Sequence, residues 1–93
     1  MRLEFKSKKL KTFFEKGSSP GVLKVHERRL KEVLMILMDA NSIQDLLQIK
    51  GTHPMSSGSP YKGYWAIRVS GAWRLVFRIN EEKISDLDYV QYH

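Results

Sequence analysis

The 93-residue chain has no cysteine, only three prolines and no long apolar run. Without cysteine it has neither disulfides nor thiolate metal sites. No stretch approaches the roughly 20 apolar residues of a membrane span, and the opening residues lack the apolar core of a signal peptide. We therefore expect a cytoplasmic protein without membrane contact. At this length we expect a single domain, residues 1–93, around one hydrophobic core.

The chain has fewer acidic than basic residues. It contains 10 Asp and Glu and 16 Lys and Arg, which gives a formal net charge of +6. This excess favours a polyanionic partner such as nucleic acid, and a basic surface without a partner is the alternative. The sequence has no acidic cluster typical of two-metal nucleases, no histidine pair with metal-ligand spacing and no glycine-rich phosphate loop. We expect no metal and no cofactor.

The first half of the chain predicts a strand and two helices. Residues 2–6 alternate in polarity, as a short strand does. Residues 8–16 and 22–39 place apolar side chains three and four positions apart, which predicts amphipathic helices. The segment 17–21 separates them because it contains glycine and proline. His26 has no second metal ligand nearby, so we expect it to be structural.

The last third of the chain alternates strictly and predicts a β-hairpin followed by a third strand. The apolar positions are odd-numbered in both arms of the hairpin: Trp65, Ile67 and Val69, then Trp73, Leu75, Phe77 and Ile79. Opposed residues of an antiparallel pair share a face, so both apolar sets share one only in a particular register. A three-residue loop, 70–72, gives that register, with Val69 opposite Trp73 and Arg68 opposite Arg74.

The polar face of this hairpin predicts an anion-binding platform. Like charges directly across a sheet are destabilising unless an acid or an anionic ligand offsets them. In the third strand, the register that buries the apolar residues brings Asp86 to Arg78, which predicts an ordinary salt bridge. The same register places Asp88 only diagonal to Arg74, so Arg68 and Arg74 are weakly neutralised, and it brings Tyr92 to their face.

These residue types suit a phosphodiester. Paired guanidinium donors match phosphate oxygens and stay charged, and a phenol such as Tyr92 stacks a base or transfers a proton. His53 and His93 carry imidazoles, a side-chain type suited to proton transfer, and Lys62, at the end of the loop 51–63, adds a positive charge. The set fits a metal-free RNA cleavage, in which the 2′-hydroxyl attacks its own phosphate and arginines stabilise the charge that builds there.

Several of these residues have an ordinary alternative. A hydrogen bond to the loop backbone explains His53 as well as catalysis does. Tyr64 lies on the arginine face, where it is suited to stack a base, but a cross-strand contact with Arg78 is the more frequent arrangement. His93 is the last residue, and chain ends commonly fray.

Three segments of the chain resemble one known family: His53-Pro54-Met55, Gly63-Tyr64-Trp65-x-Ile67-x-Val69-x-Gly71-x-Trp73-Arg74-Leu75-x-Phe77, and Asp88-Tyr89-x-x-Tyr92-His93. The family is the HigB branch of the RelE/ParE toxin superfamily, and residues 5–17 are similar to it too. The resemblance therefore covers nearly the whole chain. It implies an α+β fold, in which two N-terminal helices pack on a small, mostly antiparallel β-sheet.

The resemblance also implies a function. Such proteins are toxins of type II toxin–antitoxin systems: ribosome-dependent mRNA endonucleases that inhibit translation in the bacterial cytoplasm. A helix-turn-helix antitoxin of the HigA type neutralises them, commonly in a heterotetramer. The family's catalytic set falls on four residues here: His53, Arg74, Tyr92 and His93. Arg68, Lys62 and Tyr64 are our additions, as residues that contact the phosphate or the RNA.

Two positions depart from the family pattern. Ser56 stands where the branch usually has a lysine, in a longer loop, and Gln91 stands where it usually has an acid. Both changes remove groups that would move protons or stabilise charge. A non-cleaving relative that binds an antitoxin or the ribosome is therefore the alternative function. Poisoning of DNA gyrase, the role of the ParE branch, is a third possibility that the Tyr92-His93 terminus disfavours.

Overall fold

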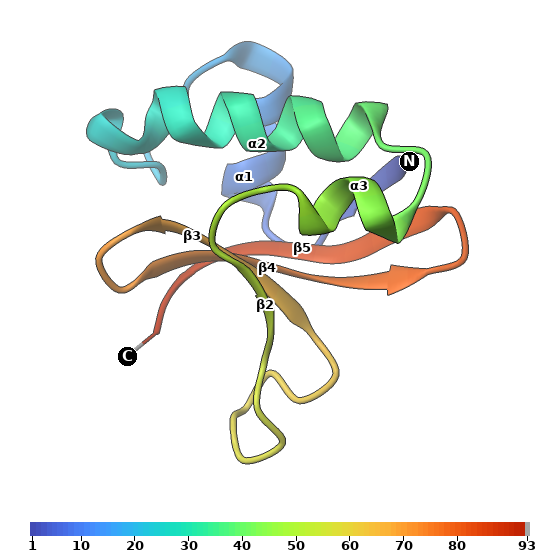
Figure 1. The fold of residues 1–93 in the computed structure, drawn as a ribbon. Coiled ribbons are helices and arrows are strands. Elements are labelled where there is room, and N and C mark those ends of the chain that lie inside the picture. The colour runs from blue at the N-terminus through green and yellow to red at the C-terminus, as the bar shows by residue number, and fades with distance from the viewer. Residues whose placement is uncertain (93) are drawn as a thin grey trace.

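Residues 1–92, the part of the chain that this computed structural model describes, form one five-stranded sheet with three α-helices on one face (Figure 1). The strands are β1 (Arg2–Phe5), β2 (Thr52–Pro54), β3 (Trp65–Ser70), β4 (Trp73–Asn80) and β5 (Lys83–Gln91). Their order across the sheet is β1-β5-β4-β3-β2. The β1–β5 pair is parallel, and the other pairs are antiparallel. The predicted α+β fold is confirmed.

The helices begin and end largely where the sequence predicts. They are α1 (Lys8–Lys16), the 3-10 turn η1 (Lys24–His26), α2 (Glu27–Asp39) and α3 (Ile43–Leu47). The Ser7 hydroxyl accepts the Leu10 amide at 3.1 Å and caps α1, and Gly17 ends that helix in the left-handed conformation. The predicted helix 22–39 begins later, because Leu23 is extended and η1 precedes α2.

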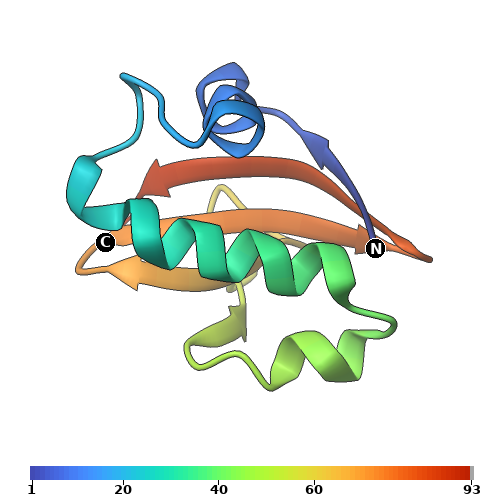
Figure 2. The same cartoon turned by 90° about the horizontal axis from the view of Figure 1, so that it is seen from above.

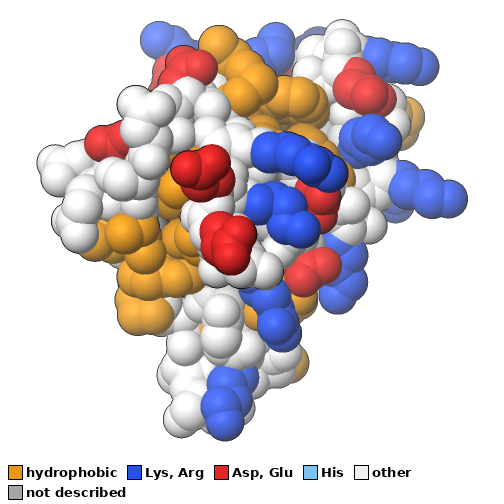
Figure 3. Space-filling model, turned by 90° about the vertical axis from the view of Figure 1, so that its right-hand side faces the viewer, with side chains coloured by type: hydrophobic (Ala, Val, Ile, Leu, Met, Phe, Trp, Pro, Cys, Tyr) orange, Lys and Arg blue, Asp and Glu red, His pale blue; other side chains and the backbone are white. Residues whose placement is uncertain are grey.

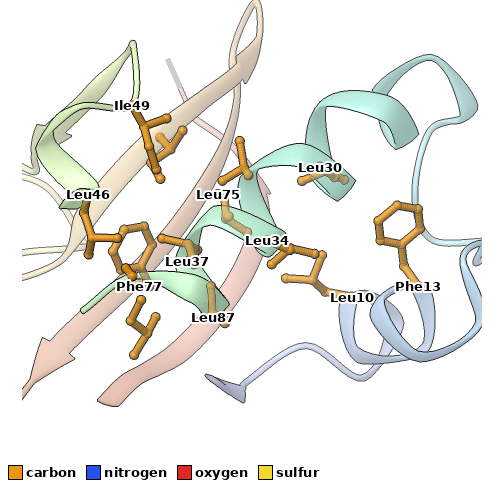
Figure 4. Close-up of a cluster of buried hydrophobic side chains, with 14 of the residues drawn as sticks. Leu10, Phe13, Leu30, Leu34, Leu37, Leu46, Ile49, Leu75, Phe77 and Leu87 are labelled. Carbon is orange, nitrogen blue, oxygen red and sulfur yellow. The ribbon is translucent and has the colours of Figure 1, made fainter. Parts of the chain in front are cut away.

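The core lies between α2, which runs along the sheet (Figure 2), and the helix-facing side of the strands. Leu34 and Leu37 of α2 lie over Leu75, Phe77 and Leu87 (Figure 4). Leu10 and Phe13 extend this core below α1. The odd-numbered apolar residues of β3 and β4 thus face the helices, as the alternation predicts.

A second, smaller apolar cluster lies on the opposite side of the sheet, which we call the open face. Its buried members are Tyr64, Ala66 and Val76, and side chains of the loop between β2 and β3 pack against them. Figure 1 shows that loop projecting below the sheet, away from the helices. The open face therefore has its own ordered covering at one end.

One predicted pairing within the hairpin is wrong. Arg68 does pair with Arg74, but Ser70, not Val69, pairs with Trp73. An irregularity between Arg68 and Ser70 inserts Val69 as an extra residue, so the turn is shorter than predicted and Gly71 adopts a positive φ of 55°. The bulge keeps Arg68 and Arg74 opposite each other on one face of the sheet and shortens the turn.

His26 has the structural role that we expected. It is buried, and its Nδ1 and the Tyr89 hydroxyl group share a hydrogen bond with the two atoms 2.5 Å apart. The Tyr89 ring stacks on Trp73 with centroids 4.5 Å apart, and the His26 ring meets Trp73 edge-on at 5.7 Å. These contacts join η1 to β4 and β5 on the helix-covered side of the sheet, near the β3–β4 turn.

Candidate functional site

Four adjacent elements bring the candidate residues to one end of the open face. Arg68 of β3 lies directly opposite Arg74 of β4. Tyr92 follows β5, and its amide donates to the Ala72 carbonyl in the β3–β4 turn at 2.7 Å. His53 lies on β2, two strand spacings from β4 and so roughly 10 Å from it. Arg68, Arg74 and Tyr92 are therefore gathered at the turn, and His53 lies at the sheet edge.

The Arg74 side chain is held at the β3–β4 turn and still has free donors. Its Nη1 donates to the carbonyls of Gly71 and Trp73. Within residues 1–92 no carboxylate lies within 4.0 Å of this guanidinium. Because a guanidinium has five N–H donors, those on Nε and Nη2 remain available to an anion.

Arg68 adds a second guanidinium in the same acid-poor surroundings. Its side chain is exposed, and among the described residues it forms no ion pair. Arg29 donates to the backbone carbonyls of Arg68 and Lys50, the latter at 2.9 Å, so a third basic side chain lies at this corner. The strand register thus concentrates positive charge where like charges repel, as an anion site requires.

Away from the β3–β4 turn, some acidic side chains form salt bridges with basic ones. Glu4 of β1, at the far edge of the sheet, pairs with Arg2 at 3.0 Å and with Lys83 at 3.3 Å. On the side that carries the N-terminus and the β4–β5 turn, basic and acidic side chains are interspersed (Figure 3). The uncompensated arginines of the β3–β4 turn differ from that surface.

Tyr64 makes the cross-strand contact that the sequence favoured. The Arg78 guanidinium carbon lies 4.7 Å from the Tyr64 ring centroid, and Arg78 Nε lies 3.8 Å from an oxygen of Asp86. The salt bridge forms although Ser85, not Asp86, is the paired residue in β5. With 9% of its surface exposed, Tyr64 has little area to offer a nucleobase.

His53 makes the loop hydrogen bond that the sequence analysis gave as the alternative to catalysis, and its second ring nitrogen stays exposed. Its Nδ1 lies 3.1 Å from the Gly51 carbonyl, which is the loop hydrogen bond foreseen as the alternative to catalysis. Because a carbonyl only accepts, Nδ1 carries the proton in this arrangement. The side chain is exposed, so in the neutral imidazole the lone pair on Nε2 is free to accept a proton.

The remaining predicted residues contribute less to the observed geometry. Lys62 is exposed in the loop and, in residues 1–92, forms no ion pair. His93 lies outside the described residues. The described part of the chain also contains no group of three or more His, Asp or Glu side chains that could hold a metal ion, and no helix suited to span a bilayer.

Tyr61 is the site residue that sequence reasoning missed. Its ring lies 5.5 Å from that of Tyr64 and 5.9 Å from that of Tyr92, nearly perpendicular to both. The loop around it shows no periodicity, so no pattern marks its direction. The available signal was its type: it is the one aromatic residue in a stretch of small and polar residues, 56–63.

The arrangement as a whole suits an RNA phosphodiester. Two guanidiniums offer charge and paired donors, a tyrosine is bonded through its amide to the adjacent turn, and a histidine with a free nitrogen lies at the edge. Such a set can bind a phosphate, stabilise added negative charge and move a proton.

Comparisons with known proteins are consistent with this chemistry. A family model described as the RelE-like toxin of type II toxin-antitoxin system HigB matches residues 3–93. Endoribonuclease HigB of Proteus vulgaris is 36% identical over 90 residues, which cover 96% of each chain.

Two solved structures share the fold. YafQ from E. coli strain BL21(DE3) has a TM-score of 0.61 at 19% identity, over 98% of this chain and 93% of that one. The YoeB-YefM complex from Staphylococcus aureus has a TM-score of 0.56 at 18% identity, over 100% of this chain and 97% of the other.

Proposed function

The chain belongs to the HigB family of RelE-like toxins of type II toxin–antitoxin systems, and we propose that it is a ribosome-dependent mRNA endonuclease that needs no metal. Residues 1–93 act as a single toxin domain in the cytoplasm and inhibit translation by cutting mRNA. Its antitoxin is of the helix-turn-helix, HigA-like type, and the two form a heterotetramer. The curated relative named as an endoribonuclease supports the cleavage reaction.

The placement of Arg74 is the observation that carries this proposal. Arg74 lies opposite a second arginine, is anchored at the β3–β4 turn and has donors to spare. In the reaction the 2′-hydroxyl oxygen bonds to the adjacent phosphorus and the bond to the 5′-oxygen breaks. The products are a 2′,3′-cyclic phosphate and a 5′-hydroxyl. Arg74, with Arg68, stabilises the negative charge on the phosphorane oxygens.

Protons move through the other residues of the set. His53 takes the proton of the 2′-hydroxyl on Nε2, because its Nδ1–H is engaged by Gly51. Tyr92 donates to the phosphate oxygens from beside the β3–β4 turn. His93 is assigned to protonation of the leaving 5′-oxygen from the family resemblance alone. Lys62 adds charge along the RNA strand, and Tyr64 supports the wall of the site.

A second candidate function is a non-cleaving relative that binds its antitoxin or the ribosome. Ser56 and Gln91 favour this candidate, because both positions lack the charged groups that the family uses. The two functions predict different outcomes for the same experiment.

Induced expression in a bacterial host tests the proposal. Wild-type protein should arrest growth, and primer extension on a reporter mRNA should detect cuts that require translation of that mRNA. Arg74→Ala should lose both effects, while the control Arg2→Ala, an exposed arginine on β1, should keep them. Normal growth with intact mRNA and soluble wild-type protein would contradict cleavage and favour the binding module.

A further inference from the structure

We propose that Tyr61 is a positioning residue, which orders the Tyr92 side chain beside the arginines at the β3–β4 turn. The inference rests on the proposed function, since Tyr92 matters there as a phosphate-contacting phenol. It assigns a role to the long loop between β2 and β3, which contains Ser56, one of the two departures from the family pattern.

Tyr92 needs such support because it lies beyond the last strand. β5 ends at Gln91, and the backbone of Tyr92 is held to the turn by its amide bond to the Ala72 carbonyl at 2.7 Å. A residue outside the hydrogen-bonded strands is poorly ordered unless other contacts tie it down. The ring of Tyr92 meets that of Tyr61 at a centroid distance of 5.9 Å and an interplanar angle of 86°, the edge-to-face geometry that aromatic pairs favour.

Tyr61 is itself fixed by the loop around it. Its amide donates to the hydroxyl of the buried Ser59 at 3.1 Å, and its carbonyl accepts the Tyr64 amide at 2.9 Å. The Ser59 amide in turn donates to the Ser56 carbonyl at 3.1 Å. These bonds hold the backbone of Tyr61 and so limit the directions that its ring can take.

The ring of Tyr61 is also joined to the rigid part of the sheet. It lies 5.5 Å from the buried ring of Tyr64, whose carbonyl accepts the Met55 amide at 2.9 Å. Arg78 of β4 covers that ring at 4.7 Å. A continuous series of contacts therefore runs from Arg78 through Tyr64 and Tyr61 to Tyr92. Through these contacts the sheet restrains the Tyr92 ring.

The matched pair of variants is Tyr61→Ala, which removes the ring, and Tyr61→Phe, which keeps it. The first readout is independent of activity: the ¹⁵N heteronuclear NOE of the Tyr92 amide and the ring resonances of ¹³C-labelled tyrosines. The second is the single-turnover rate of mRNA cleavage on programmed ribosomes, measured against ribosome concentration. Tyr61→Leu, which keeps apolar bulk in the loop, replaces Tyr61→Ala if the latter does not fold.

We expect Tyr61→Phe to match the wild type in both readouts. Tyr61→Ala should lower the Tyr92 NOE, shift its ring resonances and slow cleavage about two- to tenfold, as the loss of one edge-to-face pair predicts. The half-saturating ribosome concentration should not change, because the change affects the order of one catalytic side chain and not the binding of the ribosome.

Unchanged Tyr92 signals in Tyr61→Ala would overturn the inference, and so would equal losses in Tyr61→Phe and Tyr61→Ala, which would assign the effect to the hydroxyl group. A wild-type protein that does not cleave mRNA would contradict the proposed function instead. The NMR comparison would then still decide whether Tyr61 orders Tyr92.

Discussion

On the helix-covered face of the sheet, β3 and β4 present Ile67, Leu75 and Phe77, all fully buried. On the open face the same two strands present Arg68 and Arg74, with Tyr92 beside them. Because side chains alternate along a strand, residues adjacent in sequence serve different purposes. The comparison teaches that alternation places most of the apolar core on one face and the candidate phosphate site on the other.

The largest loss of stability is expected from a substitution in the core. Phe77→Ala removes a fully buried ring that contacts the helices, and we expect it to lower the free energy of unfolding by about 3–5 kcal/mol. Urea denaturation measures the change. A loss below about 1 kcal/mol would mean that the helix-covered face is not the main source of stability.

The open face should respond in activity instead. Arg68→Gln removes a charge from the candidate phosphate site, and hydrogen bonds to charged groups contribute about 1.5–3 kcal/mol. We therefore expect cleavage to fall roughly 10- to 100-fold with the free energy of unfolding nearly unchanged, since the side chain is exposed. Arg2→Ala is the control. Wild-type cleavage by Arg68→Gln would confine the phosphate site to Arg74.

A polar contact beneath the β3–β4 turn tests the comparison more finely. Tyr89→Phe leaves the buried Nδ1 of His26 without its hydrogen-bond partner, and we expect a loss of about 1–3 kcal/mol in unfolding free energy. Combining it with His26→Phe should cost less than the sum of the two single changes. Strict additivity in urea denaturation would show that the two side chains do not interact.

The smallest expected effect is a pH dependence. Burial raises the pKa of Tyr89 above its ordinary value of 10.0, and a backbone contact from Leu23 offsets part of the rise. Above that pH the unfolded chain loses this proton more readily than the folded one, so stability falls as pH rises through the folded pKa. We would measure thermal unfolding between pH 9 and 11, roughly the window around the ordinary tyrosine pKa of 10.0. The unfolding temperature should decline more steeply with pH in wild type than in Tyr89→Phe. Parallel curves would contradict it.

The sequence predicts what depends on local patterns. Gly17 ends α1 as expected, because capping involves only nearby residues. The alternation of β3 and β4 predicts that Arg68 faces Arg74, since parity survives along a strand. Both expectations are confirmed.

Features that depend on tertiary contacts were not predicted. The extra residue Val69 changes the turn without leaving a mark in the alternation. The strand β2 is three residues long, too short for a period to show. Tyr61 acquires its place through contacts with Tyr64 and Tyr92, which no spacing encodes.

The most direct test of the division between the faces compares two neighbouring residues, Arg74 and Leu75. Purified Arg74→Ala should keep its free energy of unfolding within about 1 kcal/mol of wild type and cleave mRNA on programmed ribosomes about 10²- to 10³-fold more slowly. Leu75→Ala should lose about 2–5 kcal/mol of stability yet cleave normally per folded molecule. If Arg74→Ala unfolds, or if folded Leu75→Ala does not cleave, the division of the sheet into a stabilising face and a catalytic face is contradicted.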